Sequence, residues 1–398
     1  MTRAHDLLVL AHLALWAQIG VMMRVYLSKI FVLGCSGSWG PCLAGSNGVY
    51  TGSLPANMLG SLIMGALAAA SVLELESKKP VTILPAGHPW QLNVPLHIGL
   101  RTGLCGSLTT FGTWQVEVLT LAIRDNAWVN AVVAFLIGLC CPLISYVVGM
   151  HVALAVDRYL LAPEGEGVLE QRESFRVGEV AAELGGAAQE LGSPEQESEL
   201  QLERDLPRSS VRRSTEATVE ESASATDKYM ALYAGKKTHA ATVLLLAAVL
   251  AGWSVGLALE EDHLWVRTSF LSSMLGIFGC WLRYVLAQSL NYQGQSRWPW
   301  YPMGTLAANM LGTAIDFGLQ ALLTKRGPSL GYWGGLVVSA LQTGLCGALT
   351  TVSTLVAEIV KFSSLFPEEA HVYWYSLHTF GGGLLLGIAI YGWAGWTA

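Results

Sequence analysis

Nine apolar stretches, each long enough to cross a bilayer as a helix, dominate this sequence. A spanning helix needs about 20 predominantly apolar residues. Only 13% of the residues are charged, against roughly 25% in an ordinary soluble domain. The stretches are residues 7–33, 49–73, 98–123, 128–156, 239–259, 264–290, 301–323, 336–362 and 371–396. The sequence therefore predicts an all-α, polytopic membrane protein with nine transmembrane helices.

The segment between the fourth and fifth stretches, residues 157–238, differs in composition. It holds 10 Lys and Arg against 17 Asp and Glu, a net charge of −7, whereas the whole chain carries −6. Rich in Glu, Ser and Gln and almost without aromatic residues, it lacks the apolar surface needed to fold alone. We expect an acidic disordered linker, in which Ser214 of "RRST" matches a basophilic kinase site.

Positive charges near the spans predict the orientation. The short loops on the two sides carry equal numbers of Lys and Arg, but Arg158, Lys228, Lys236 and Lys237 lie at the ends of the linker. Lys and Arg concentrate in cytoplasmic loops. We therefore expect the N-terminus and the linker in the cytoplasm and the C-terminus outside. The first stretch has only six residues before it and no small-residue cleavage signature, so we expect an uncleaved anchor.

Three motifs occur twice and in the same order. The stretch "GLCGSLTTFGTWQVE" at 103–117 matches "GLCGALTTVSTLVAE" at 344–358. Upstream, "GVMMR" ending at Arg24 matches "GCWLR" ending at Arg283. Between them, "GSLPANMLG" matches "GTLAANMLG", with Asn57 and Asn309 at the same offset. The chain is therefore a tandem duplication.

The number of spans between the copies predicts their relative orientation. Four spans would return the chain to its starting side, and the additional span at 239–259 reverses the second copy. We expect a first four-helix unit at 1–156, the linker at 157–238, an inverting helix at 239–259 and a second unit at 260–398. Inverted repeats commonly build a transport path at their mutual interface.

These motifs resemble those of the Fluc/CrcB fluoride channels, and the layout resembles the tandem, nine-helix form of the eukaryotic fluoride exporters (FEX). The resemblance covers essentially all of the chain except the linker and the loop at 79–95. It implies a passive, fluoride-selective channel that exports fluoride across the plasma membrane and detoxifies the cell. It also implies a chain that works as a monomer, because one chain contains both halves of the pair.

Several repeated side chains could replace water around a small, strongly hydrated anion. Asn57 and Asn309 offer two N–H donors each. Phe111 and Trp114, at i and i+3 on one helix face, can present ring edges of partial positive charge. The resemblance assigns this aromatic pair to the pore. Hydroxyl groups stand at matching positions of the two copies, on Thr110, Thr113, Thr351 and Thr354.

The paired glycines of "GLCG-LTT" lie in the middle of a span, where Gly weakens a helix. A break there frees backbone carbonyls, which a membrane tolerates only if they are buried or ligated. The resemblance implies that the two breaks cross at the centre and hold one structural sodium ion through carbonyls. By position, the ligands would be Gly106, Thr109, Gly347 and Thr350.

The two copies have diverged at the aromatic pair. Val352 and Leu355 replace the rings in the second copy. In the last span, Tyr375 and Thr379 fit the hydroxyl track of the resembled family, whereas Phe135 and Gly138 stand in the fourth span. We expect one conducting pore lined by Phe111, Trp114, Tyr375 and Thr379, with Asn309 as its amide. A vestigial pore would be lined by Val352, Leu355, Phe135 and Gly138.

Other charged and sulfur groups leave alternatives open. Arg is costly deep in a membrane, so we expect Arg24 and Arg283 near the surface, as mouth charges or as snorkelling anchors. Asp316 is expected at a vestibule edge or bonded to an Arg, or as a carboxylate that reaches the headgroups. Cys35 and Cys42 flank "SGSWGP" in a loop expected outside, where a disulfide is permitted.

Other classes of protein fit less well. The sequence has no Walker motif, nucleophile elbow, zinc-ligand spacing or paired-carboxylate signature, and we expect neither an enzyme nor a nucleic-acid partner. A proton-coupled exporter of small molecules would need an embedded acid in the first span of each half. Only Asp6, at the edge of the first span, comes close. A scaffold that displays the linker would not require matched Asn and Gly motifs.

Overall fold

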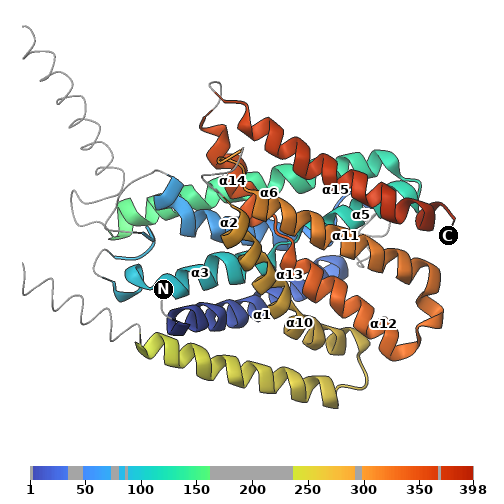
Figure 1. The fold of residues 1–398 in the computed structure, drawn as a ribbon, viewed down its shortest axis with the longest axis horizontal. Helices are drawn as coiled ribbons and strands as arrows, with labels where there is room; N and C mark the ends of the chain where they lie inside the picture. The colour runs from blue at the N-terminus through green and yellow to red at the C-terminus, as the bar shows by residue number, and fades with distance from the viewer. Residues whose placement is uncertain are drawn as a thin grey trace, which may run out of the picture. The chain divides into compact units, whose positions relative to one another are not determined.

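The computed structural model describes residues 3–34, 48–72, 80–85, 88–161, 236–291, 298–365 and 369–397. Every regular element within these ranges is a helix (Figure 1). The all-α prediction is therefore confirmed for the part of the chain that the structure describes. Cys35, Cys42, Ser214 and residues 162–235 of the linker lie outside it.

The first repeat contains three long helices and one broken span. The long helices are α1 (Arg3–Gly34), α2 (Leu54–Val72) and α6 (Trp128–Val156). The broken span consists of α3 (Val94–Ile98), the π-helix η2 (Gly99–Cys105), α4 (Gly106–Leu108) and α5 (Phe111–Ile123). A 3-10 helix, η1 (Pro89–Leu92), precedes α3, and a π-helix, η3 (Asp157–Leu161), extends α6.

The second repeat has the same order after one intervening helix, Lys236–Leu259. Its long helices are α10 (Leu264–Leu290), α11 (Met303–Arg326) and α15 (His371–Trp396). Its broken span consists of α12 (Gly331–Ala340), the π-helix η5 (Leu341–Cys346), α13 (Gly347–Leu349) and α14 (Ser353–Ser363). A 3-10 turn, η4 (Gly327–Ser329), joins α11 to α12.

Seven of the described helices are long and apolar enough to cross a membrane, by length and composition. The chain is thus a membrane protein with several spans. Two of the nine predicted spans are missing from this set. Leu54–Ala70, within the second predicted span, falls below the length, and no helix of the third predicted span is among the seven, although the equally broken Gly331–Ser363 is. The nine-helix inverted topology therefore stays a prediction.

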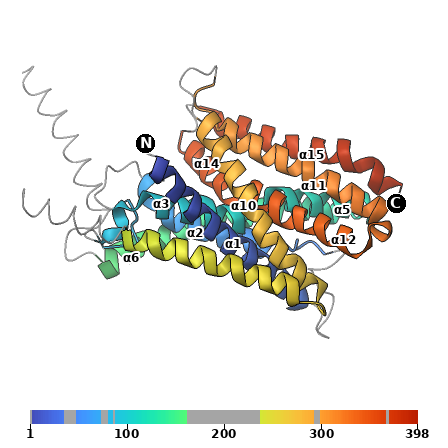
Figure 2. The same cartoon turned by 60° about the horizontal axis from the view of Figure 1, so that its bottom comes forward.

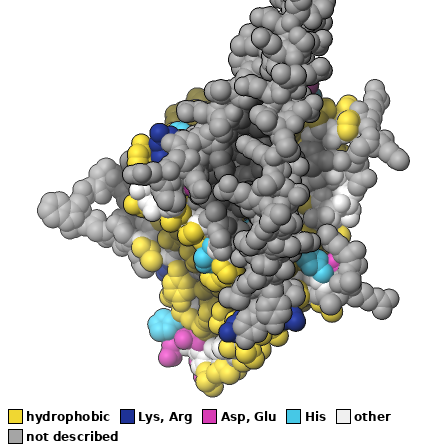
Figure 3. Space-filling model, turned by 90° about the vertical axis from the view of Figure 1, so that its left-hand side faces the viewer, with side chains coloured by type: hydrophobic (Ala, Val, Ile, Leu, Met, Phe, Trp, Pro, Cys, Tyr) yellow, Lys and Arg dark blue, Asp and Glu magenta, His cyan; other side chains and the backbone are white. Residues whose placement is uncertain are grey.

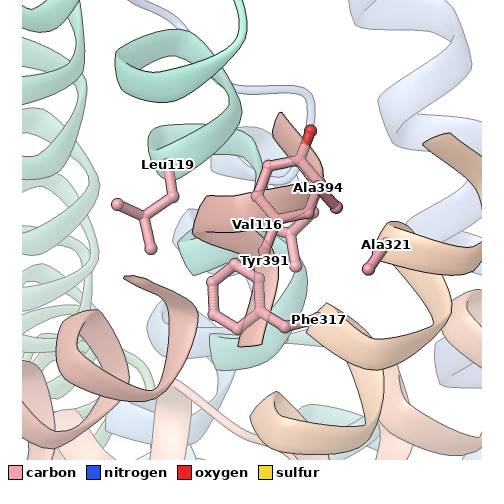
Figure 4. Packing of buried hydrophobic residues seen from close by; sticks show 6 residues of the cluster. All are labelled: Val116, Leu119, Phe317, Ala321, Tyr391 and Ala394. Atoms are coloured by element: carbon pink, nitrogen blue, oxygen red, sulfur yellow. The ribbon is translucent and has the colours of Figure 1, made fainter. Parts of the chain in front are cut away.

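The second half encloses α5 of the first half. Val116 and Leu119 of α5 pack with Phe317 of α11 and Tyr391 of α15 in one buried cluster (Figure 4). A Cβ atom on Gly387 of α15 would lie 2.2 Å from Leu119 and 2.4 Å from Phe317, so glycine is required for this approach. Close van der Waals packing between the repeats joins them into one core.

The first helices of the two repeats also pack together. Trp281 of α10 donates its Nε1 hydrogen to the Leu10 carbonyl of α1 (3.1 Å), and the hydroxyl of Ser273 donates to the Gln18 carbonyl (2.8 Å). Polar bonds of this kind join helices where lipid offers no hydrophobic driving force. Helices α1 and α10 lie next to each other in both ribbon views (Figures 1 and 2).

The helix Lys236–Leu259 lies at the edge of this body, beside α1 in both ribbon views (Figures 1 and 2). His239 meets His12 of α1, with Nδ1 and Nε2 3.0 Å apart, and Trp253 stacks on Phe270 of α10 at 5.3 Å. Only 6% of its apolar 18-residue segment is buried inside the protein. Hydrophobic side chains cover much of the described face in Figure 3, as expected of a surface against lipid.

The contacts divide the chain into two compact units. The first comprises Met1–Ala69, Val94–Val152 and His239–Ala398, and the second comprises Ala70–Asn93 and Ala153–Thr238. Both repeats and the intervening helix contribute to the first unit. Within the second unit, Gln91 accepts from the Val81 N–H and donates to the Val81 carbonyl, each at 2.9 Å. All of the predicted site residues belong to the first unit.

Candidate functional site

Each repeat breaks its third helix at the predicted glycine pair. The π-helices η2 and η5 lead into three-residue helices that end at Thr109 (φ −89°, ψ 154°) and Thr350 (φ −84°, ψ 154°). These extended residues interrupt the ladder of i to i−4 hydrogen bonds. A new helix begins within three residues of each break. The predicted breaks are therefore present in both halves.

The two asparagines hold the breaks open. Oδ1 of Asn57 accepts from the Thr110 N–H (2.8 Å), and its Nδ2 donates to the Thr110 carbonyl (3.2 Å). Asn309 makes the same bonds to Thr351, at 2.8 and 3.2 Å. Both asparagines are buried. Each amide nitrogen has a second hydrogen, for which the described residues supply no acceptor within hydrogen-bonding distance.

The hydrogen bonds between asparagine and threonine leave one backbone carbonyl in each half without its usual helical donor. In a continuous helix, the N–H groups of Thr110 and Thr351 would donate to the carbonyls of Gly106 and Gly347, four residues earlier. Because the asparagine oxygens take these N–H groups, both glycine carbonyls need other partners. The asparagines therefore set the electrostatics of the break as well as its shape.

A threonine side chain from each half caps the start of a helix in the other half. The hydroxyl of Thr109 accepts from the N–H groups of Val352 (3.2 Å) and Ser353 (3.1 Å), at the start of α14. The hydroxyl of Thr350 accepts from the Gly112 N–H (3.1 Å), at the start of α5. The first N–H groups of a helix have no partner inside it, so each break completes a helix of the opposite repeat.

The remaining threonine hydroxyls lie around this crossing. The Oγ1 atoms of Thr110 and Thr350 are 3.1 Å apart, and Oγ1 of Thr351 is 3.2 Å from Oγ1 of Thr109. Thr110 also donates to Thr113 (3.1 Å). Thr354, by contrast, takes part through its backbone, since its N–H donates to Oγ1 of Thr351 (3.4 Å). The predicted threonines therefore form one polar centre that includes residues from both repeats.

The arginines are buried at the breaks. Arg24 and Arg283 are 4% and 3% exposed. Arg283 donates to the carbonyls of Gly106 and Thr102, both at 2.6 Å, and Arg24 donates to the carbonyl of Thr343. Neither side chain is exposed as a snorkelling anchor would be, whereas their depth in the membrane stays a prediction. Each guanidinium reaches into the opposite repeat, where backbone carbonyls accept some of its hydrogen bonds. Nε of both arginines and Nη1 of Arg24 have no hydrogen-bond partner among the described residues.

The four carbonyls expected to bind sodium lie at these breaks, on Gly106, Thr109, Gly347 and Thr350. Among the described residues, no group of three His, Cys, Asp or Glu side chains offers a metal site. The released Gly106 carbonyl accepts from Arg283 and, with two lone pairs, can accept once more. Uncharged oxygen ligands suit a hard cation, so the residues fit sodium.

The aromatic pair belongs to a box of rings. Phe111 and Trp114, both buried, lie 5.9 Å apart in a T-shaped arrangement. Phe135 of α6 stacks on Trp114 at 5.3 Å, and Phe380 of α15 lies 6.1 Å from both members of the pair. A Cβ atom on Gly138 would lie 2.1 Å from Nε1 of Trp114. The box therefore contains rings from both repeats.

Phe135 and Gly138 were expected to line a second pore with Val352 and Leu355. In the structure they form a wall of the box around Trp114, because α6 packs against the indole. The division into two pores stays a prediction. The corresponding residues of the second half, Val352 and Leu355, are buried with exposures of 2% and 1%.

Tyr375 and Thr379 lie on the face of α15 that also carries Gly383, since these residues are four apart. A Cβ atom on Gly383 would lie 3.0 Å from the Phe111 ring. Tyr375 donates its hydroxyl to Oε2 of Glu358 (2.5 Å). One helix face thus connects the rings of the first repeat to hydroxyls of the second.

The sequence analysis missed two acids, Glu358, which is buried, and Glu117, which is partly buried. Glu117 and Glu358 end the two repeated stretches at the same offset. Ser53 donates its hydroxyl to Glu117 (2.5 Å), and Thr305 donates to Glu358 (2.7 Å). Ser53 and Thr305 are also equivalent in the repeat. The matching Glu at the end of each quoted copy was the signal that could have identified them.

Asp316 is buried next to the crossing. Its Oδ1 accepts from Nε2 of Gln342 (2.9 Å), and its Oδ2 accepts from the hydroxyl of Thr113 (3.4 Å). It is 1% exposed, which excludes a carboxylate that reaches the headgroups. Neither Arg24 nor Arg283 hydrogen-bonds to it within the described residues. It does border a cavity, as the vestibule alternative expected.

Two cavities reach the crossing from the end of α1. One, of about 580 Å³, has three acids and two amides in its wall, with Glu117, Asp316 and Gln342 among them, and one basic residue, Arg124. The other, of about 770 Å³, has Arg24 and Lys29 in its wall and many hydroxyl groups. Both include Thr113, so an acidic and a basic recess meet at one residue of α5.

Comparison with known proteins agrees with the duplicated motif set. Residues 11–150 and 270–395 match the family described as CrcB-like protein, Camphor Resistance (CrcB), which covers both repeats and most of the chain. The chain belongs to the CrcB family. The two matched segments correspond to the two halves that cross at Thr109 and Thr350.

Curated relatives in the CrcB family carry fluoride-related names. The chain is 36% identical over 141 residues to the Fluoride export protein 1 of Neurospora crassa, and 32% identical over 151 residues to that of Candida albicans. It is 39% identical over 108 residues to the Fluoride-specific ion channel FluC of Bordetella avium.

The alignments differ in how much of each relative they cover. They span 35% of this chain in both fungal comparisons, but only 25% of the Neurospora protein and 37% of the Candida protein. With the bacterial channel they span 27% of this chain and 77% of the relative. No solved structure matches the chain.

Proposed function

We propose that this protein is a passive, fluoride-selective channel that exports fluoride from the cell. One observation carries the proposal: buried hydrogen-bond donors without partners gather around the aromatic pair. Nε1 of Trp114, Nε2 of Gln115 and Oγ1 of Thr379 are buried donors that have no hydrogen-bond partner among the described residues, and the acceptor Oε1 of Gln115 has none either. Each buried polar group without a partner lowers the stability of the fold by about 1–3 kcal/mol. A small anion that accepts from them would recover this cost.

The chemistry of the path suits fluoride. A pore must replace the hydration shell of its ion with groups that bind well enough for entry and weakly enough for exit. Ring edges and uncharged N–H and O–H groups meet this requirement better than a guanidinium would. Arg24 and Arg283 already hydrogen-bond to backbone carbonyls, so their charge is partly shielded from a passing ion.

We propose one conducting and one vestigial pore. The conducting path would run along Asn309, Tyr375, Thr379, Phe111 and Trp114. Two arrangements support it. Thr305 lies one helical turn before Asn309 and bonds to Glu358, which also accepts from Tyr375. From Tyr375, the same face of α15 continues through Thr379 to Gly383, which packs against Phe111. The vestigial path would contain Asn57 and the apolar Val352 and Leu355.

The sodium ion is part of the proposal. It would be held by the carbonyls of Gly106, Thr109, Gly347 and Thr350, and its positive charge would offset the carbonyl dipoles at the crossing. The residues of this chain perform the rest: Asn57 and Asn309 release two of the carbonyls, and the threonine hydroxyls join the repeats. The proposal places the protein in the plasma membrane as a monomer, with N-terminus and linker in the cytoplasm and C-terminus outside.

A proton-coupled exporter is the second candidate function, since the buried acids Asp316 and Glu358 and the partly buried Glu117 favour it. Purified protein in liposomes loaded with potassium fluoride separates the two. A passive channel builds up a voltage, so efflux should require valinomycin to carry potassium out. Efflux at full rate without valinomycin would indicate coupled, electroneutral export and overturn the channel proposal. An absence of efflux under both conditions would overturn fluoride transport altogether.

A further inference from the structure

A cavity lined by rings lies at one end of the second repeat, where α11 and α15 begin. Its volume is about 560 Å³, within the range of small-molecule sites. The lining side chains are almost all aromatic or acidic: Trp298, Trp300, Tyr301, Glu369, His371, Trp374 and His378. We call this group the aromatic cage. None of its members takes part in the proposed fluoride path.

Internal contacts hold the inner wall of the cage in place. Trp300 stacks on His371 at 3.6 Å, and Nδ1 of His371 is 2.5 Å from Oε2 of Glu369. The hydroxyl of Tyr301 lies 2.9 Å from Nδ1 of His378. Tyr301 itself is only 2% exposed. These rings are therefore fixed before any ligand arrives, which reduces the entropy cost of binding.

The outer wall is open to the surroundings. Trp298 is 49% exposed, Trp374 55%, and the Glu369 side chain 50%. Trp and Tyr are enriched where a spanning helix meets the headgroups, so exposed rings at the start of α15 are ordinary in themselves. Aromatic residues at this position in a membrane protein do not in general surround a cavity. Here the rings surround a cavity and share it with a carboxylate.

Rings around a cavity with one carboxylate match a particular ligand chemistry. The negative ring faces attract a cation, and quaternary ammonium groups are typically bound in aromatic cages. Such a group has no N–H to donate, which fits a wall with few polar atoms. The Glu369 carboxylate complements its charge. Since the cage lies at the ends of spanning helices, the trimethylammonium group would belong to a lipid headgroup.

We propose that the aromatic cage binds the choline headgroup of a phosphatidylcholine molecule, with Trp374 and Trp298 against the trimethylammonium group and Glu369 as its counter-charge. The cage residues are not members of the fluoride path, although the Tyr301 ring lies 5.4 Å from that of Tyr375. It predicts a preference for choline lipids over ethanolamine lipids of the same chains, because the smaller ammonium group retains its hydration and its N–H donors.

Lipid retention by the purified full-length protein tests the proposal. The protein is mixed with equal amounts of phosphatidylcholine and phosphatidylethanolamine carrying identical chains, and the bound lipid is measured by native mass spectrometry. We expect a phosphatidylcholine adduct that Trp374→Ala weakens by roughly two- to fivefold, as loss of a partly exposed cation–π contact implies. Glu369→Gln, which keeps the shape of the side chain, should weaken it as well.

The control is Trp396→Ala. Trp396 is 65% exposed and lies at the opposite end of the same helix, so its loss should leave the adduct unchanged. Equal retention of the two lipids, or an adduct that survives both cage variants, would overturn the proposal. Saturation by soluble choline chloride without any preference between the lipids would overturn the assignment to a lipid headgroup. Thermal unfolding of each variant excludes general loss of structure as the cause.

Discussion

Asn309 holds both backbone groups of Thr351, through an N–H to Oδ1 bond of 2.8 Å and an Nδ2 to carbonyl bond of 3.2 Å. Asn57 holds Thr110 at the same two distances. Because the two asparagines make the same pair of hydrogen bonds, a variant of one serves as the control for a variant of the other. Any difference between their variants reports on conduction, since their structural contribution is the same.

Replacement of each asparagine by alanine should separate these roles. Asn57→Ala and Asn309→Ala should lower the free energy of unfolding by similar amounts, about 1–3 kcal/mol, since each leaves the same backbone groups unpaired. Fluoride efflux from liposomes should fall severely in Asn309→Ala and only mildly in Asn57→Ala. Equal partial losses of efflux would mean two working pores and contradict the single-pore proposal.

The rings and their replacements can be compared in the same way. Phe111→Ile removes the ring edge but keeps much of the apolar volume, and should reduce efflux severely. Val352→Ala, at the equivalent buried position, should leave the rate nearly unchanged. Efflux is measured with a fluoride electrode after both variants are shown to fold. Normal transport by Phe111→Ile would remove the ring from the permeation path.

Gly347 packs directly against the guanidinium of Arg24. A Cβ atom there would be 2.0 Å from Nη1 of Arg24, so Gly347→Leu should displace the arginine and abolish assembly and transport. Gly252→Leu is the matched control, because no atom lies within 4 Å of a Cβ at that position. Monodisperse elution in detergent and efflux are the measurements. Normal transport by Gly347→Leu would show that the close approach at the break is not required.

Thr350 caps the opposite repeat with its hydroxyl. Thr350→Ser keeps the acceptor for the Gly112 N–H and should be mild. Thr350→Val has nearly the same shape but loses the cap, and should lower stability by about 1 kcal/mol. Thermal unfolding in detergent compares the two. If the variants behave alike, the bond between the repeats contributes little.

Removal of sodium should destabilise the wild-type protein. If the carbonyls of Gly106, Thr109, Gly347 and Thr350 hold the ion, replacement of sodium by N-methylglucamine should lower the melting temperature, because a ligand that binds only the folded state stabilises it. Titration of sodium at constant ionic strength checks this. A melting temperature that does not depend on sodium would exclude the central ion.

Asp316 places a carboxylate in the cavity beside the crossing. Asp316→Asn keeps an oxygen for Gln342 but removes a negative charge that repels fluoride. We expect faster efflux, with a larger gain at low ionic strength, where charges are less screened. The rate is measured over a range of salt concentrations. An unchanged rate at all of them would leave Asp316 with a structural role only.

Several features of this protein were predictable from local sequence. The length and apolarity of the spans specify a membrane protein, because the bilayer sets the length of a helix. Paired glycines mark both breaks, since a helix is weak where Gly is frequent. The equivalence of Asn57 and Asn309 follows from their place in the repeated motif, independent of what they contact.

The contacts of these residues were decided only by the tertiary structure. The hydrogen-bond partners of Arg24 and Arg283 could not be predicted from sequence, because the carbonyls that accept from them belong to the other repeat. Phe135 was assigned to another pore, because nothing in its own helix indicates that it stacks on Trp114. Local propensity acts over a few residues, whereas each of these partnerships depends on how helices far apart in sequence pack together.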